Sequence, residues 1–178
     1  AATGEIMGTP KEMIGSVRMS RQWIYLTGGQ GEGMVRRRLA IGHDLALDRA
    51  GFHGTGAGSQ PTGLMNLAEV QSVAMCGVTP TFLKISEVLG KIADQNAESA
   101  SIGFTATAIL AARLMATLEA SAAGSKMIWT GRIDDGLISG YRAIGSTQIR
   151  KNLGSGADEH GFMAGPWDQC YVLLFGAL

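Results

Sequence analysis

The chain has 178 residues, of which 46% are hydrophobic and 17% are charged, so its length suits about one ordinary globular domain with a sizeable core. Fifteen basic and fifteen acidic residues cancel, and this balance favours neither a strongly basic nucleic-acid-binding protein nor an acidic, solvated tail. No apolar run approaches the roughly eighteen residues of a membrane span, and no charged-then-apolar leader opens the chain. We therefore expect neither a span nor an export signal.

The first predicted elements are a loop and a short strand. Residues 1–15 are small and rich in glycine, which indicates an extended segment or loop. Val17 and Met19 alternate with polar neighbours, as in a half-buried strand. Ser20 is placed to cap a short turn that holds Trp23.

A long amphipathic helix is predicted next, from Glu32 to Ala50. Its apolar residues recur at spacings of three and four, which predicts a single buried stripe with the charged residues on the opposite side. Glu32 stands four residues before Arg36, the favourable order for a helical ion pair. Gly51 is expected to end the helix as a left-handed cap. The stripe consists of Met34, Val35, Leu39, Ile41, Leu45, Ala46 and Ala50, and the charged side of Arg36, Arg37, Arg38, Asp44, Asp48 and Arg49.

The glycine-rich segment G-T-G-A-G-S-Q-P-T-G, residues 54–63, follows this helix. Backbone N–H groups in such loops can hold phosphate, so a small-molecule or nucleotide-binding enzyme that uses Gly54–Gly63 is one interpretation. A dinucleotide fingerprint needs its glycines between a strand and a helix, and a phosphate loop needs a Gly-Lys-Ser/Thr sequence that this segment lacks. We therefore interpret the segment as a turn.

The second half of the chain predicts strands and helices in alternation. Residues 64–78 are predicted to be an irregular connector with a short apolar strand near 70–75, and an amphipathic helix over 82–95 starts after Thr79-Pro80. A central strand over 101–107 is followed by an alanine-rich helix over 108–120, and then by strands over 126–130 and 137–144 around the polar turn 131–136. The last predicted elements are a polar loop over 152–161, a strand over 161–165 and an apolar segment over 167–174. Together they predict an α+β fold in which helices flank a mixed sheet.

A search for chemically active groups finds little. His43, His53 and His160 are scattered, and each is read as an ordinary polar or core residue. Cys76 and Cys170 have no metal-like spacing with them, so we predict two free, reduced thiols in a reducing compartment. Asp134 and Asp135 belong to a turn, 158–160 to a solvated loop, and Gly154-Ser155-Gly156 lacks the setting of a hydrolase nucleophile. The sequence therefore assigns no catalytic, cofactor-binding or metal-binding residue.

The order of the pieces is more informative than any one residue. S-R-Q-W-I at 20–24, then the long helix, then G-T-G-A-G-S-Q-P-T-G-L at 54–64 closely resembles the major capsid proteins of tailed bacteriophages, the Hong Kong ninety-seven fold. In that family a T-P-K type segment, here 9–11, leads from an extended loop to a spine helix. Further matching positions are Gly56, Gly58, Gln60, Pro61, Thr62 and Gly63 in the turn, Asp135, Gly136, Gly140 and Tyr141 in a D-G-x-x-x-G-Y element, and the G-x-W-D-Q element at 165–169.

The resemblance implies two domains. Residues 1–70 would be the returning strand of the extended loop plus part of the peripheral domain with its spine helix, and 71–178 the axial domain. The family's N-terminal arm, first loop strand and last peripheral strands have no counterpart, so the chain is expected to be truncated at both ends. Some members cross-link lysine to asparagine between subunits, but the asparagine would lie past Leu178 and no matching lysine precedes Thr9. We assign no such chemistry.

The implied function is structural. Subunits would close into hexamers and pentamers that tile an icosahedral shell around double-stranded DNA, contacted non-specifically, in the virion of a tailed phage or prophage. Assembly would occur in the host cytoplasm, with a scaffolding protein or protease as further partners and without a cofactor or membrane. The alternative is a bacterial nanocompartment shell of the encapsulin type, which shares the fold but holds cargo enzymes.

The resemblance also places residues 118–136 near the symmetry axis of the hexamer or pentamer. Alanines, serines and Gly124 leave this segment with little core of its own. We therefore expect a mobile projection in the isolated chain that meets neighbouring subunits in the shell.

Overall fold

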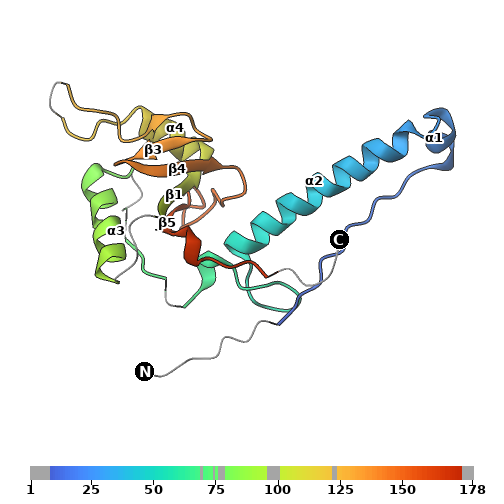
Figure 1. Ribbon diagram of the computed structural model, residues 1–178, viewed down its shortest axis with the longest axis horizontal. Coiled ribbons are helices and arrows are strands. Elements are labelled where there is room, and N and C mark those ends of the chain that lie inside the picture. The colour runs from blue at the N-terminus through green and yellow to red at the C-terminus, as the bar shows by residue number, and fades with distance from the viewer. Residues whose placement is uncertain are drawn as a thin grey trace. The chain divides into compact units, whose positions relative to one another are not determined.

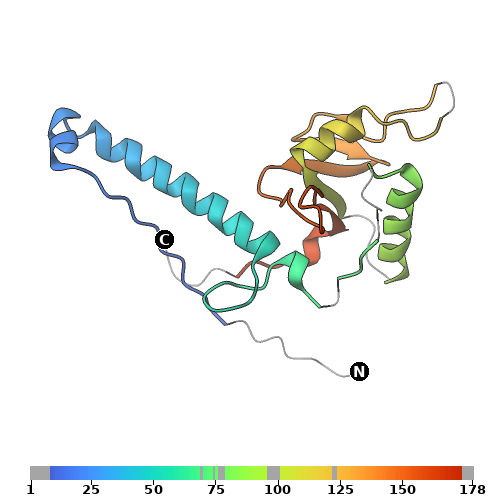
Figure 2. The ribbon, with the colours of Figure 1, turned by 180° about the vertical axis from the view of Figure 1, so that it is seen from behind.

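The structure is a computed structural model, and it describes residues 9–68, 70–73, 75, 79–95, 101–121 and 124–173. The chain divides into two compact units, one of Ala1–Ala68 with Val172–Leu178 and one of Glu69–Tyr171. We call them the helix unit and the sheet unit. Figures 1 and 2 show their elements from two sides.

The helix unit is built on α2, Gln30–His53, which has 24 residues. It follows α1, Arg21–Leu26, and the Ser20 side chain caps α1 by accepting a hydrogen bond from the Trp23 backbone N–H, as predicted. Gly31 at the start of α2 lies against Trp23, so close that a Cβ there would be 2.6 Å from the indole ring. This contact holds the two helices together at their junction.

The long predicted helix is present, but it extends beyond both predicted ends. Gly51 lies inside α2 and is not its cap; the helix continues to His53, and Gly54 closes it by donating to the Ala50 carbonyl at 2.9 Å. The extra turn persists because His53 is buried and its ring lies near that of Phe52, with centroids 6.4 Å apart. Tertiary burial outweighs the weak helix propensity of Gly51 here.

The prediction of one buried stripe along α2 is wrong. Its buried residues are Gly31 and His53, at its two ends. Between them one row is half-buried, and we call it the covered row: Val35, Leu39, His43 and Leu47. Leu39 packs on the backbone at Gly15, in the extended segment that runs back along α2 before α1 (Figure 1). A single strip of chain covers only part of a helix, so the rest of α2 stays exposed.

Residues 9–20 are extended but do not form the predicted strand. They pair with no described strand, and the side chains of Val17 and Met19 are exposed. An alternating pattern produces a strand only where a second backbone edge accepts its hydrogen bonds. Lys11 instead donates to the Gly58 carbonyl at 2.9 Å, which attaches this segment to the glycine-rich turn.

The glycine-rich segment 54–63 is a turn, as predicted. Gly56 donates to the Pro61 carbonyl at 3.1 Å, and Gly63 donates to the Gly54 carbonyl at 2.8 Å. Gly54 and Gly63 are required by close approach of backbone, because a Cβ at Gly54 would lie 2.1 Å from the Pro61 oxygen and one at Gly63 would lie 2.4 Å from the Gly54 nitrogen. A short helix, η1, Leu64–Asn66, follows.

The sheet unit contains a five-stranded mixed sheet in the order β2-β3-β4-β1-β5. Its strands are β1 Ile102–Thr107, β2 Thr130–Gly131, β3 Gly136–Ile138, β4 Tyr141–Ser146 and β5 Phe162–Pro166, and its helices are α3 Phe82–Asp94, α4 Ala108–Met115 and η3 Trp167–Gln169. β1 pairs in parallel with β4 and antiparallel with β5. The predicted mixed sheet with flanking helices is confirmed.

The core of the sheet unit gathers around β1. All six of its residues are buried, so the prediction of a central strand is confirmed. α4 packs on β1 and β4, and α3 packs on β5. Phe104 stacks on Phe162 with centroids 5.5 Å apart and meets Tyr141 edge-on at 6.3 Å. The large side chains that are fully buried are Trp129, Phe104, Ile85, Leu114, Ile128 and Ile138.

The strand predicted near 70–75 is wrong for the described residues 70–73 and 75, which form no strand. Besides shifts of one residue at other ends, three further predicted elements have different bounds. α4 ends at Met115 and not at residue 120, because Leu118 pairs with Met127 across a bridge. The strand predicted over 137–144 is two strands, since Ser139 and Gly140 have φ of 52° and 85° and form a two-residue turn between β3 and β4. The strand predicted over 126–130 shrinks to β2, because Ile128 and Trp129 turn into the core.

Candidate functional site

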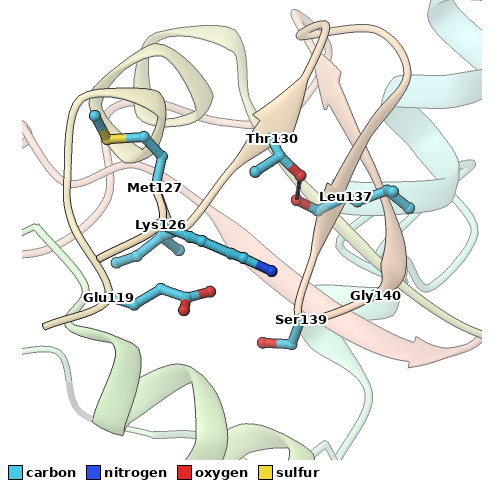
Figure 3. A pocket seen from close by; sticks show the side chains of 8 residues that line it. Glu119, Lys126, Met127, Thr130, Leu137, Ser139 and Gly140 are labelled. Carbon is cyan, nitrogen blue, oxygen red and sulfur yellow. Dashed lines mark hydrogen bonds between the residues drawn. The ribbon is translucent and has the colours of Figure 1, made fainter. Parts of the chain in front are cut away.

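The sheet unit has a hollow of about 440 Å³ where the loop after α4 returns to β2. Backbone hydrogen bonds build its wall: the Glu119 N–H donates to the Lys126 carbonyl at 2.9 Å, and the Ile128 N–H donates to the Thr117 carbonyl at 2.9 Å. The Thr130 hydroxyl donates to the Leu137 carbonyl at 3.3 Å and joins β2 to β3 at its edge (Figure 3). The lining residues are Glu119, Lys126, Met127, Ile128, Thr130, Leu137, Ser139 and Gly140.

Charged and polar side chains lie at the opening of the hollow. Figure 3 shows the Lys126 side chain extending into it, with the Glu119 carboxylate and the Ser139 hydroxyl on the same opening. The ammonium can donate hydrogen bonds, the carboxylate can accept them and the hydroxyl can do both, so this opening can form ion pairs and hydrogen bonds with polar groups. The described lining residues include no histidine, the side chain that most often serves as the base beside a serine nucleophile.

The groups considered for chemistry are not brought together. His43 is half-buried in the middle of α2 and His53 is buried at its end, whereas His160 belongs to the sheet unit. The Nδ1 of His160 is buried without a hydrogen-bond partner among the described residues. Cys170 is exposed and forms no disulfide, while Cys76 lies outside the described residues. In the described part of the chain, no three His, Cys, Asp or Glu side chains are grouped to hold a metal ion.

Asp134 and Asp135 lie in the turn between β2 and β3, as predicted. Arg132 makes a two-pronged contact with Asp134 at 2.9 and 2.8 Å, and Arg142 donates to Asp135 at 3.2 Å. The hydrogen bonds from Arg132 hold the pKa of Asp134 below its usual value. On α3, a hydrogen bond from Lys84 likewise lowers the pKa of Glu87. All three ion pairs are exposed to solvent.

The turn over 54–63 uses most of its backbone donors internally. The N–H groups of Thr55 and Ala57 point to side-chain oxygens, at 3.4 Å to Gln60 Oε1 and 3.4 Å to Thr55 Oγ1. Gly56 and Gly63 donate to backbone carbonyls across the turn. Phosphate binding by a glycine-rich loop requires several such N–H groups to be free and convergent. The geometry therefore counts against the nucleotide-binding interpretation.

Exposed apolar side chains are the most prominent unexplained feature of both units. On α1, Tyr25 is 83% exposed and Leu26 is 80% exposed, and Ile14 of the extended segment is equally open. In the sheet unit, Leu118 and Met127 are exposed beside the hollow. Large apolar side chains clustered at a surface mark contacts with other chains.

Sequence reasoning missed the hollow, because its lining comes from two loops that are neighbours only in the folded chain. The Ser139-Gly140 dipeptide was the available signal, since Ser-Gly is a common turn sequence. The apolar segment at 167–174 was predicted to need partners. Trp167 finds one by donating to the Gly103 carbonyl at 2.9 Å, and Asp168 by accepting from Ser101, but Tyr171, Val172 and Leu173 remain exposed.

Comparison with known proteins identifies a family for this chain. The family model described as "Phage capsid family" matches residues 1–175. No match is found among curated proteins. Within the described residues, no helix combines the length and apolar character that crossing a bilayer requires.

Proposed function

The chain belongs to the phage capsid family, and we propose that it is a major capsid subunit of the Hong Kong ninety-seven fold. Family membership makes it a structural capsid protein of a bacteriophage that assembles with copies of itself. In our proposal the copies form hexamers and pentamers that close an icosahedral shell around double-stranded DNA. The shell is assembled in the host cytoplasm, with a scaffolding protein or protease as transient partners.

The order of elements supports this fold. A long helix, α2, ends in a tight glycine-rich turn, and a separate mixed α+β unit follows. We assign residues 1–70 to the spine helix with the returning strand of an extended loop, and residues 71–178 to the axial domain. The compact units divide between residues 68 and 69, close to that assigned boundary, whereas Val172–Leu178 belongs to the helix unit and not to the sheet unit.

The observation that carries the proposal is the large amount of apolar surface that the helix unit leaves open. Ile14, Tyr25 and Leu26 are largely exposed, and α2 buries only its end residues. A monomeric protein rarely leaves such a concentration of apolar side chains in water. Copies of the chain in a shell would cover it, as in obligate interfaces.

The test is to image the particles formed by the protein produced from its complete reading frame, including any residues that flank positions 1 and 178. We expect closed icosahedral particles by electron microscopy. After nuclease treatment of particles from infected or induced cells, we expect protected double-stranded DNA inside. Particles that contain a protein cargo and no DNA would identify a nanocompartment shell and contradict the phage proposal.

The loop after α4 is proposed to contact neighbouring subunits about a symmetry axis. Figure 1 shows the described parts of this loop, on either side of residues 122–123, extending away from the sheet. The expectation that the whole of 118–136 lacks a core is wrong, since Ile128 and Trp129 are fully buried. The contact is therefore assigned to residues 118–127, whose Leu118 and Met127 are exposed.

Hydrogen exchange tests this assignment. In the isolated chain, the amides of Ile128 and Trp129 are expected to exchange slowly because they are buried and hydrogen-bonded. Most of residues 118–127, apart from the hydrogen-bonded Glu119, are expected to exchange quickly. In assembled shells, exchange over 118–127 should slow by at least about tenfold. Equal, fast exchange in both states would exclude these residues as an assembly contact.

A further inference from the structure

The helix α2 carries a second apolar row, which we call the open row: Met34, Ile41 and Leu45. These side chains are 63%, 44% and 42% exposed. Ile41 lies two residues after Leu39, which places it roughly 200° around the helix from the covered row. The spacings of seven and four keep the three residues in one line along α2. Within the described residues of the helix unit, this apolar face of α2 is therefore left uncovered.

Charged residues follow one side of the open row in a fixed order. Arg37 is placed about 60° from it, near its N-terminal end, and Asp44 lies on the same side two turns later. Asp48 continues that side by one more turn. The side chains of Arg37 and Asp44 are exposed, and neither forms an ion pair or hydrogen bond with a described residue. From the N-terminal to the C-terminal end of α2, this edge is therefore first basic and then acidic.

This order is complementary to itself when two helices run antiparallel. In such a pair the two-fold axis lies in the interface plane and is perpendicular to both helices. This symmetry places the same edge of each helix on the same side of the interface. Arg37 of one copy then stands opposite Asp44 of the second copy, and the reciprocal pair forms on the far side of the axis. Ile41 lies next to the axis, so the open rows meet at their centre.

A parallel pairing would be less favourable. It brings the edge with Arg37 against the opposite edge, where Arg38 and Arg49 stand. Arg37 would then face Arg38 of the second copy, and like charges at contact distance oppose association. Charge order therefore selects the antiparallel arrangement.

We propose that α2 docks antiparallel on α2 of a second copy through the open row, with Arg37 of each chain paired with Asp44 of the other. The inference rests on the proposed function in that it names one contact by which subunits join. It assigns a different face of the helix unit from the exposed residues of α1.

Double-stranded DNA is the competing occupant of this face. Arg36, Arg37 and Arg38 could contact phosphates, but Arg36 already pairs with Glu32 at 2.6 Å. Asp44 and Asp48 lie along the same edge and would repel phosphate. DNA also leaves the apolar side chains of the open row uncovered. A second copy of the chain accounts for both the apolar and the charged residues.

A charge exchange separates the two occupants. Arg37→Glu and Asp44→Arg are each expected to weaken self-association by roughly tenfold in sedimentation velocity, because each places two like-charged pairs across the axis. The double variant, Arg37→Glu with Asp44→Arg, should restore it to within about twofold. Unchanged self-association in both single variants overturns the proposal. Tighter binding of double-stranded DNA by Asp44→Arg, with self-association unchanged, assigns the face to DNA.

Cysteine cross-linking locates the axis independently. With Cys76 and Cys170 replaced by serine, Ile41→Cys should form covalent dimers at least about tenfold faster than Ala40→Cys under mild oxidation, since a disulfide requires Cβ atoms only a few ångströms apart. Ala40 is the matched control because it is exposed, adjacent and about 100° away on the helix. Equal rates overturn the antiparallel contact.

The same variants distinguish this inference from the proposed function. Icosahedral shells in which Ile41→Cys does not cross-link would overturn the α2 contact and leave the shell function intact. Preferential cross-linking of Ile41→Cys in a protein that forms no shell would support the contact and contradict the shell function.

Discussion

The sheet unit buries its large apolar residues, whereas the helix unit leaves many of its apolar residues exposed. The sheet unit fully buries six large side chains, among them Trp129, Phe104 and Leu114, around a central strand. The helix unit has a 24-residue helix whose buried residues are Gly31 and His53. Its apolar residues lie in two rows on opposite sides of α2, and only one row is even half-covered.

The difference shows where each unit obtains its stability. A closed core supplies the sheet unit with hydrophobic free energy inside one chain. The helix unit has little apolar burial of its own, and most helical stability in proteins comes from packing of an apolar face. We infer that the sheet unit folds largely by itself and that assembly completes the helix unit.

The largest expected loss of stability comes from a substitution in the core of the sheet unit. Ile85→Ala on α3 should lower the free energy of unfolding by about 3 kcal/mol, because it removes a fully buried side chain and leaves a cavity. Denaturant unfolding followed by tryptophan fluorescence measures the loss. Leu83→Ala on the same helix is the control, and since Leu83 is largely exposed its effect should stay within about 0.5 kcal/mol. Equal losses would contradict the assigned core.

The next effect concerns the turn that closes α2. Gly54→Ala places a Cβ 2.1 Å from the Pro61 carbonyl oxygen and should cost about 2 kcal/mol, because backbone must move to accept it. Gly42→Ala, inside the same helix with no neighbour within 4 Å, should instead stabilise α2 by about 0.5 kcal/mol. Thermal unfolding followed by circular dichroism compares the two, and a Gly54→Ala protein as stable as wild type would refute the close approach.

A smaller effect distinguishes the two faces of α2. Leu39→Asp should destabilise the isolated chain by about 1 kcal/mol, less than a buried stripe would imply, because Leu39 is only half-buried. Ile41→Asp, on the open row, should change the melting temperature little. Its effect should appear in assembly, where the row is covered. If Leu39→Asp leaves the melting temperature unaltered, the covered row is misassigned.

The smallest effect is a pH dependence in the turn between β2 and β3. Because Arg132 lowers the pKa of folded Asp134, the ion pair contributes stability above the unfolded pKa of Asp134 and loses it as pH falls through the folded pKa. Arg132→Ala should raise the pKa of Asp134 toward its usual value. Carboxyl titration by NMR measures this shift, with Glu87, whose pKa is lowered by Lys84, as an internal reference that should not move.

Local signals in the sequence were sufficient for much of this fold. Ser20 caps α1 because its hydroxyl reaches the Trp23 N–H three residues on, and this depends on chain geometry alone. The glycines at 54–63 predict a turn because positive φ and close backbone approach exclude side chains. The strand at 101–107 followed from its alternation and its place before an alanine-rich helix. The family resemblance also came from such local motifs, and the family match confirms it.

Contacts between distant residues were decided only by the tertiary structure. Periodicity placed apolar residues on α2, but it could not show that a single extended segment covers Leu39 and leaves Ile41 open. The strand over 137–144 breaks at Ser139-Gly140 because β3 must fold back to pair with β4, and residues 9–20 remain unpaired because a strand needs a partner edge. The hollow beside Lys126 exists because two loops meet. Each of these features depends on which surfaces the folded chain brings together. The spacing of residues within one segment does not predict such long-range contacts.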